Sequence, residues 1–280
     1  MNRKQLAQET LDILARGGYQ GPGGWVEIAG LHEKSVAESR FFPEEELPPF
    51  PENPGYPKPE PVLTDTSTVR AVLDLAAQGR QGIAVLNFAS AKNPGGGFLN
   101  GAMAQEESLA ASGGLYKTLT PHEEYYRRNR ACGHMRYTGC AIWSPEVVFF
   151  RDDTFALLPA PVTASVLTLP AVNLGQVIQK GEDLPLARRT MKARMERALA
   201  LFAAMGAREL VLGAYGCGVF RNDPGEIARW WRELLDLPAL GGRFAGVTYA
   251  VLDHSKNQSC LRAFLEEERR YRSNAGKKQG

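Results

Sequence analysis

The chain has 280 residues, of which 44% are hydrophobic and 23% are charged, so it is long enough and apolar enough for one large core. Its 33 Lys and Arg nearly balance its 31 Asp and Glu, and a formal net charge of +2 excludes a protein that binds polyanions by charge alone. No run approaches the roughly 18 apolar residues of a membrane span, and the four cysteines show no regular spacing. We therefore expect a cytoplasmic protein that has no membrane partner, does not bind nucleic acid directly, and holds any nucleotide-like ligand by local geometry.

The N-terminal part differs in composition and sequence pattern from the rest of the chain. Residues 4–16 predict a helix that ends at Gly17 and Gly18. Eight of the 18 prolines lie between Pro43 and Pro61, where we expect an extended segment on the surface of the core. We interpret residues 1–63 as an extension packed on a core domain of residues 64–270, followed by a disordered polar tail at 271–280.

From residue 64 onward, short apolar runs alternate with helical patterns. Polar side chains at 64–67 offer N-caps for a helix that ends before Gly79. Met191, Met195, Leu199 and Phe202 share one face of a later helix and are expected in the core. A last helix is expected near residues 257–271. Buried strands are predicted at 82–88, 165–172, 209–215 and 246–252, and their alternation with helices predicts a layered α/β domain with a parallel or mixed sheet.

Two glycine-rich loops follow predicted strands, where ligands of open α/β sheets bind. The later one reads GAYGCGVFRND, residues 213–223, and leads into a helix with Asp223 as N-cap, Pro224 at its first position and Glu226 completing a capping box. Free backbone N–H groups beside a helix N-terminus suit a diphosphate. The alternative is a tight strand-to-helix turn whose glycines serve packing only. Cys217 has no base near it in the sequence, so we expect it to be a small loop residue and not a nucleophile.

The earlier loop reads NPGGGFLNGAMAQEESL, residues 93–109. Three consecutive glycines allow the backbone to approach a sugar or a phosphate closely. Glu106 and Glu107 then open a helical pattern, where one can bind sugar hydroxyls and the other can act as general acid in glycoside cleavage. The alternative is that both glutamates only interact with the helix dipole.

A metal site is a weaker hypothesis. Cys132, His134 and Cys140 could supply three ligands, whereas a structural zinc site uses four at tighter spacing. No cluster of aspartates resembles a magnesium site. We expect neither a metal nor a cofactor.

The spacing of NPGGG and QEE resembles the GGG-x(6–8)-QEE signature of poly(ADP-ribose) glycohydrolases of the short, bacterial type. The run LNFASAKNPGGGFLNGAMAQEESLAASGGLYKTL is similar to that family almost throughout, and GAYGCGVFRND resembles the diphosphate loop of the macrodomain fold. The similarity extends from about residue 64 to residue 264. It implies a three-layer α/β/α sandwich with a mixed central sheet and a glycosidase acting in ADP-ribosylation and the DNA damage response.

The resemblance also implies roles for individual residues. Glu107 is expected to be the general acid and base, and Glu106 to hold the distal ribose. The substrate-binding residues implied are Asn87, Asn93, Gly95, Gly96, Gly97 and Gln105 in the first loop region, and Gly213, Tyr215, Gly216, Cys217, Gly218, Val219 and Phe220 in the second. The substrate's own phosphates are expected to stabilise the positive transition state, which would allow one acid to suffice.

Poly(ADP-ribose) and ADP-ribose are the expected partners, with ADP-ribosylated proteins as a further one. Two alternatives stay open: a non-catalytic ADP-ribose reader, and a hydrolase of mono-ADP-ribosylated proteins. The intact glutamate pair favours the enzyme over the reader. Adenine contacts are expected from the extension or from residues 64–67.

Overall fold

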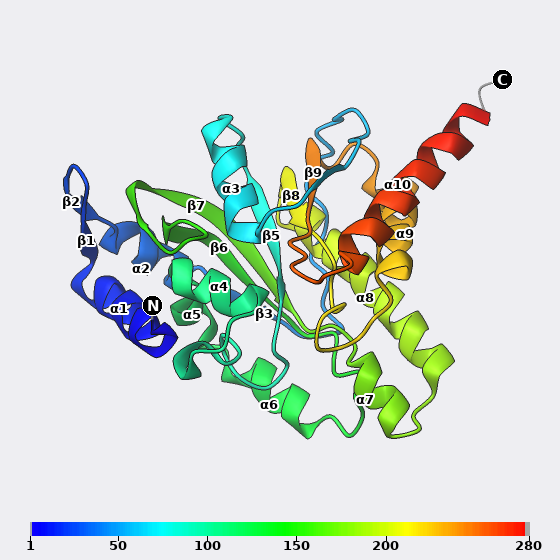
Figure 1. Cartoon of the computed structure of the whole chain (residues 1–280), viewed down its shortest axis with the longest axis horizontal. Helices are drawn as coiled ribbons and strands as arrows, with labels where there is room; N and C mark the ends of the chain where they lie inside the picture. Colours follow the sequence, from blue (N-terminus) through cyan, green and yellow to red (C-terminus); the bar gives the residue numbers. More distant parts are fainter. Residues whose placement is uncertain (1, 278–280) are drawn as a thin grey trace.

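A mixed seven-stranded sheet forms the centre of the molecule in the computed structural model, which describes residues 2–277 (Figure 1). The strand order is β3-β6-β7-β5-β8-β9-β4. The β3–β6 and β6–β7 pairs are antiparallel and the other pairs are parallel. The strands are β3 (Arg40–Phe42), β4 (Val62–Thr64), β5 (Ile83–Phe88), β6 (Ala141–Arg151), β7 (Leu157–Leu169), β8 (Glu209–Leu212) and β9 (Gly246–Ala250).

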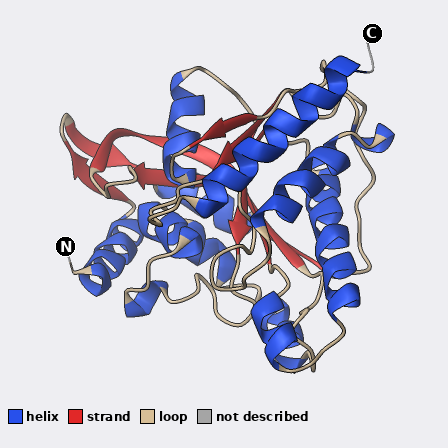
Figure 2. Cartoon of the chain, turned by 45° about the vertical axis from the view of Figure 1, so that its right-hand side comes forward, coloured by secondary structure: helices blue, strands red, loops and turns tan. Residues whose placement is uncertain are grey.

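Helices cover both faces of this sheet (Figure 2). Alternate residues of β5 point to opposite layers: Ala84 and Leu86 pack in one apolar cluster, Ile83 and Val85 in the other. The first cluster includes residues of α7 (Leu174–Gln179), α8 (Leu184–Ala204), α9 (Pro224–Leu235) and α10 (Ser259–Lys277); the second includes residues of α3 (Thr68–Ala77), α4 (Gln105–Ser112), α5 (Leu115–Leu119) and α6 (Glu123–Ala131). The predicted three-layer α/β/α architecture is confirmed.

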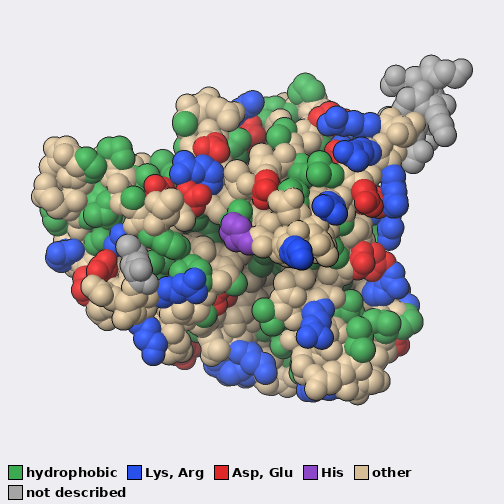
Figure 3. Space-filling model, viewed as in Figure 1, with side chains coloured by type: hydrophobic (Ala, Val, Ile, Leu, Met, Phe, Trp, Pro, Cys, Tyr) green, Lys and Arg blue, Asp and Glu red, His purple; other side chains and the backbone are tan. Residues whose placement is uncertain are grey.

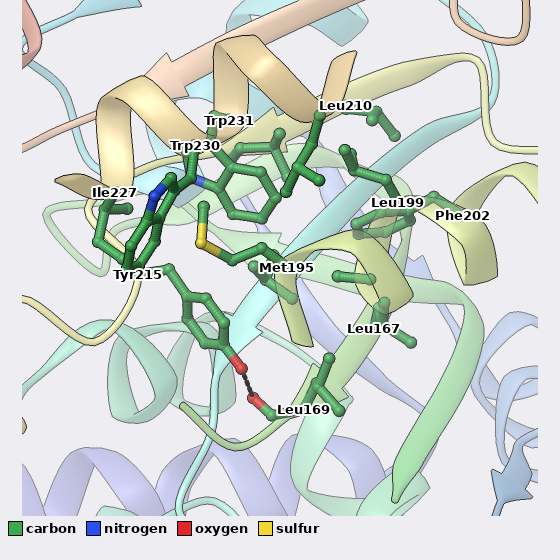
Figure 4. Packing of buried hydrophobic residues seen from close by; sticks show 14 of the residues in the cluster. Leu167, Leu169, Met195, Leu199, Phe202, Leu210, Tyr215, Ile227, Trp230 and Trp231 are labelled. Atoms are coloured by element: carbon green, nitrogen blue, oxygen red, sulfur yellow. Dashed lines mark hydrogen bonds between the residues drawn. The ribbon is translucent and has the colours of Figure 1, made fainter. Parts of the chain in front are cut away.

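The predicted apolar face of α8 lies in the core. Met191, Met195, Leu199 and Phe202 are fully buried, and Figure 4 shows the last three beside residues of the sheet and Trp231 of α9. In the same cluster the hydroxyl of Tyr215 donates to the carbonyl of Leu169 at 2.8 Å. This bond ties the start of the second glycine-rich loop to the end of β7.

The first 63 residues reach both edges of the sheet. Helix α1 (Arg3–Arg16) is capped by Asn2 and ends at Gly17, whose φ is 74°, as predicted. The hairpin of β1 (Gly18–Gly21) and β2 (Gly24–Glu27) follows, then α2 (Ala29–Ala37). Strand β3 joins one edge of the sheet, and β4 joins the other. Between them the proline-rich segment runs without regular structure, and its carbonyl groups accept hydrogen bonds from Arg197 and Arg243.

Several predicted boundaries were wrong. Strand β7 begins at Leu157 instead of residue 165. It ends at Leu169 instead of residue 172, because Pro170 has no N–H to continue the ladder of hydrogen bonds. Strands β8 and β9 end at Leu212 and Ala250, where the chain turns into loops. Helix α10 extends through Lys277, so most of the expected disordered tail is helical, and residues 278–280 lie outside the described part. No helix within residues 2–277 is both long and apolar enough to cross a membrane.

Candidate active site

A cavity of about 710 Å³ opens beside the carboxyl ends of β5, β8 and β9. The cavity is lined by Ala214 and residues 216–220 of the second glycine-rich loop, by Phe88 at the end of β5, and by Ala104 and Gln105 at the start of α4. Figure 3 shows the molecule hollowed near the centre of one face. The two loops predicted to hold the ligand therefore border one cavity, at the edge of the sheet where open α/β proteins bind ligands.

The side chain of Gln105 fixes the start of α4 against the end of β5. Its Oε1 accepts from the backbone N–H of Phe88 at 2.8 Å, and its Nε2 donates to the carbonyl of Leu86 at 2.8 Å and to Thr68 Oγ1 at 3.2 Å. These bonds satisfy backbone groups that the sheet leaves free where β5 ends. Gln105 borders the cavity and positions the two glutamates that follow it.

Glu106 is 3% exposed, and its carboxyl group is held from two sides. Oε2 accepts from the backbone N–H of Ser90 at 2.7 Å, and Oε1 accepts from Asn87 Nδ2 at 3.2 Å. Burial raises the pKa of Glu106 to about 8, against the lowering effect of these hydrogen bonds. Glu106 is therefore mostly a neutral carboxyl group near pH 7.

Glu107 is 8% exposed and bridges the first glycine-rich loop to α4. Oε1 accepts from the backbone N–H of Gly97 at 2.8 Å, and Oε2 accepts from that of Ala104 at 3.0 Å. The second bond is one half of a capping box at the start of α4, in which the side chain of the third helical residue accepts from the backbone N–H of the N-cap residue. Both bonds fix the direction of a carboxyl group that retains lone pairs for a ligand.

The three consecutive glycines are required by this geometry. Gly95 and Gly96 have φ values of 65° and 61°, in the left-handed region that favours glycine. A Cβ on Gly96 would lie 2.3 Å from Glu107 Oε1, and a Cβ on Gly97 would lie 2.6 Å from the Cβ of Ala102. Asn93 is exposed, and its carbonyl accepts from the N–H of Gly96 to form the turn.

The second loop exposes some of its predicted site residues and buries others. Gly216, Cys217, Gly218, Val219 and Phe220 line the cavity, and Val219 is 86% exposed. The ring of Phe220 lies against that of Tyr137, with centroids 6.0 Å apart. The loop ends at the predicted N-cap, since Asp223 accepts from the N–H of Glu226 at 2.8 Å.

Asn93, residues 95–97 and the two glutamates do not line the cavity, which the first loop reaches through Met103, Ala104, Gln105 and Ser108. Three further residues expected to bind substrate are buried behind the cavity wall. Asn87 and Tyr215 are fully buried, and Gly213 packs so closely that a Cβ would lie 2.5 Å from the carbonyl oxygen of Ala250. Asn87 is covered by Glu106 and also donates to Thr168 Oγ1 at 3.1 Å. These residues support the site without lining it. Burial raises the pKa of the Cys217 thiol well above its usual value, in keeping with a loop residue that is not a nucleophile.

The cysteine and histidine cluster considered as a metal site is not assembled as a ligand set. Cys132 Sγ lies 3.3 Å from His134 Nδ1, whereas Cys140 is buried in the apolar cluster around α6. Among residues 2–277, no group of three or more His, Cys, Asp or Glu side chains is arranged to hold a metal ion.

Part of the cavity comes from segments that the sequence did not indicate. Asp153 and Phe155 lie in the turn between β6 and β7, and Leu252, Asp253 and His254 follow β9. Arg3 of the extension and Thr66 and Ser67 also line it, where adenine contacts were expected. The residues between β6 and β7 and those after β9 were not predicted, because they lie far along the chain from the two loops and their local patterns are those of ordinary turns.

Comparisons with known proteins identify the family. A family model described as microbial-type PARG, catalytic domain, matches residues 7–152. The crystal structure of poly(ADP-ribose) glycohydrolase from Thermomonospora curvata is 37% identical with a TM-score of 0.88, covering 95% of this chain and 98% of that one. The glycohydrolase from Deinococcus radiodurans, solved with ADP-ribose, is 43% identical with a TM-score of 0.78, covering 86% and 98%. No curated protein matches the sequence. The chain belongs to the microbial-type poly(ADP-ribose) glycohydrolase family.

Proposed function

We propose that this chain hydrolyses the ribose–ribose O-glycosidic bonds of poly(ADP-ribose) and releases ADP-ribose. The observation that carries the proposal is the pair Glu106 and Glu107 at the first turn of α4, directly beside Ala104, Gln105 and Ser108, which line the 710 Å³ cavity. Ser90 holds the first carboxyl group and the glycine-rich loop holds the second. Membership of the glycohydrolase family and the ADP-ribose complex of the Deinococcus radiodurans relative support it.

Glu107 is assigned the acid and base roles. In its protonated form it gives its proton to the ribose oxygen that leaves, while the distal ribose becomes an oxocarbenium-like centre. The resulting carboxylate then takes a proton from the attacking water and returns to its starting state. The N–H groups of Gly97 and Ala104 hold this carboxyl group in one direction through both steps.

Glu106 is assigned to the hydroxyl groups of the distal ribose. A neutral carboxyl group can both donate to and accept from a sugar hydroxyl, and burial keeps Glu106 neutral near pH 7 through its raised pKa. Asn87 and Ser90 leave it little freedom to turn, which fixes the ribose relative to Glu107.

The second loop is assigned to the diphosphate, with Phe220 against the ribose. Residues 216–219 line the cavity, and we assign to phosphates bound there the stabilisation of the positive transition state. We further propose residues 64–270 as the catalytic domain and residues 1–63 as an extension that completes the cavity through Arg3. ADP-ribosylated proteins would then be the carriers of the polymer.

Incubation of the purified chain with poly(ADP-ribose), without added metal, tests the proposal. Release of free ADP-ribose is expected. Binding of the polymer without release would identify a reader instead. Release of ADP-ribose from mono-ADP-ribosylated protein but not from the polymer would identify a hydrolase of mono-ADP-ribosylated proteins.

A further inference from the structure

Two exposed cations lie on the outer side of the loop that holds Glu106. The N–H of Ser90 binds Glu106 Oε2, Lys92 follows two residues later, and the guanidinium of Arg130 on α6 donates to the carbonyl of Lys92 at 2.7 Å. Both side chains are exposed. Within residues 2–277, neither forms an ion pair with an acidic group.

This arrangement is unusual on α6, because its other arginines are neutralised. Arg127 and Arg128 both pair with Glu124, at 2.6 and 2.8 Å, and Arg128 also pairs with Glu45 at 3.6 Å. Figure 3 shows Lys and Arg side chains at the surface over α6, below the hollow. Lys92 and Arg130 are thus a local positive patch on a chain whose net charge is only +2.

The position of the patch relative to the cavity suggests its ligand. Neither Lys92 nor Arg130 lines the cavity, and both lie in or against the segment whose Ser90 N–H binds Glu106. The other product of the cleavage carries its own diphosphate on the leaving side of the scissile bond. Lys92 is two residues from Ser90, at most about 7 Å along the backbone, and a lysine side chain can bring its charge to phosphates next to the scissile bond.

We propose that Lys92 and Arg130 form an anion subsite for the diphosphate of the ADP-ribose unit on the leaving side of the bond. This inference rests on the proposed function and concerns only the polymer, since free ADP-ribose has no such unit. Arg130 can bind a phosphate oxygen with two N–H groups, and its bond to the Lys92 carbonyl keeps the two charges together. The subsite would favour polymer over mono-ADP-ribosylated substrates.

The test compares the unaltered chain with Lys92→Gln and with Lys92→Glu/Arg130→Glu. The double variant should raise KM for poly(ADP-ribose) about fivefold or more at low salt, because two surface contacts become repulsive. The single variant should raise KM less. The affinity for free ADP-ribose, measured by calorimetry, and kcat should stay within about twofold, and the difference in KM should shrink at high salt.

Lys180→Glu/Arg189→Glu is the matched control, since it makes the same change in net charge with two exposed residues, one at the C-cap of α7 and one on α8. An unchanged KM in the patch variants, or an equal rise in the control, would overturn the subsite. So would a parallel loss of ADP-ribose affinity and kcat, which would mean that the patch acts by holding the loop. Failure of the unaltered chain to cleave the polymer would instead contradict the proposed function.

Discussion

Gly96 and Glu107 are packed so closely that a Cβ on the glycine would lie 2.3 Å from the Oε1 atom of the glutamate. The same Cβ would lie 2.9 Å from Glu106 Oε2. The glycine-rich loop therefore does more than admit a sugar: it sets the position of both carboxyl groups.

Gly96→Ala is expected to lower kcat/KM at least about a hundredfold, because the new methyl group displaces both glutamates. It should also destabilise the fold by roughly 1–3 kcal/mol, since φ at this position is 61°. Gly181→Ala is the control: φ there is 66° and no atom lies within 4 Å of the added Cβ. It should cost similar stability and leave activity intact. Equal losses of kcat/KM in both variants would show that the loss in Gly96→Ala does not come from displacement of the two glutamates.

Gln105→Leu should cost both stability and activity. It leaves the N–H of Phe88 and the carbonyl of Leu86 without their side-chain partner, at about 1–3 kcal/mol for a buried polar group. The start of α4 then loses its tie to β5, and kcat should fall. Chemical denaturation and steady-state kinetics measure the two effects. Stability and kcat both equal to those of the unaltered chain would show that the side chain is dispensable.

The raised pKa of Glu106 predicts how the free energy of unfolding depends on pH. Its folded-state pKa of about 8 lies above the ordinary 4.5, so the folded state binds more protons between these values. The contribution of Glu106 is therefore most favourable below about pH 4.5 and is lost as the pH rises to about 8, with a slope of at most about 1.4 kcal/mol per pH unit. Glu106→Gln should remove this slope. Denaturation of both proteins at about pH 5.5 and about pH 7.5 measures it. Identical changes with pH in both proteins would show that Glu106 does not titrate in this window.

Substitutions of Phe220 and Tyr215 are expected to have different effects on ADP-ribose affinity and on stability, although both residues lie in the second glycine-rich loop. Phe220 lines the cavity, so Phe220→Ala should weaken ADP-ribose binding about tenfold, and it also removes the packing of the ring against Tyr137 and the core. The hydroxyl of Tyr215 is buried and bonded to Leu169, so Tyr215→Phe should cost about 1 kcal/mol of stability and leave affinity unchanged. Calorimetry and thermal unfolding separate the two. The reverse pattern would mean that the loop turns its side chains over on binding.

Much of the architecture was predictable because its strands are buried runs between clear helices. Strand β6 was missed although it has 11 residues, since Pro145 and Glu146 interrupt it. The register shifts there, and Glu146 takes a φ of 44°, so the strand continues through an irregularity that a local pattern does not reveal. The edge strands β3 and β4 have three residues each, too few to show a period.

The candidate site was predictable where one short segment carries it. The glutamates and glycines of residues 95–107 adjoin in sequence and in space, and so do residues 216–220. The burial of Asn87 and Tyr215 was not predictable, because a strand end and a loop start give no sign of which side chain the next layer covers. Phe155 and residues 252–254 reach the cavity only through the tertiary fold.

The role of Glu107 as the general acid and base is tested by the release of ADP-ribose from poly(ADP-ribose) by the unaltered chain and by Glu107→Gln under single-turnover conditions. Glutamine keeps the volume of the side chain but cannot donate or accept the proton, so the cleavage rate should fall by about 10²–10⁴-fold or more, with ADP-ribose affinity and thermal stability nearly unchanged. Near-normal cleavage by Glu107→Gln would contradict the assignment of Glu107 as the general acid and base.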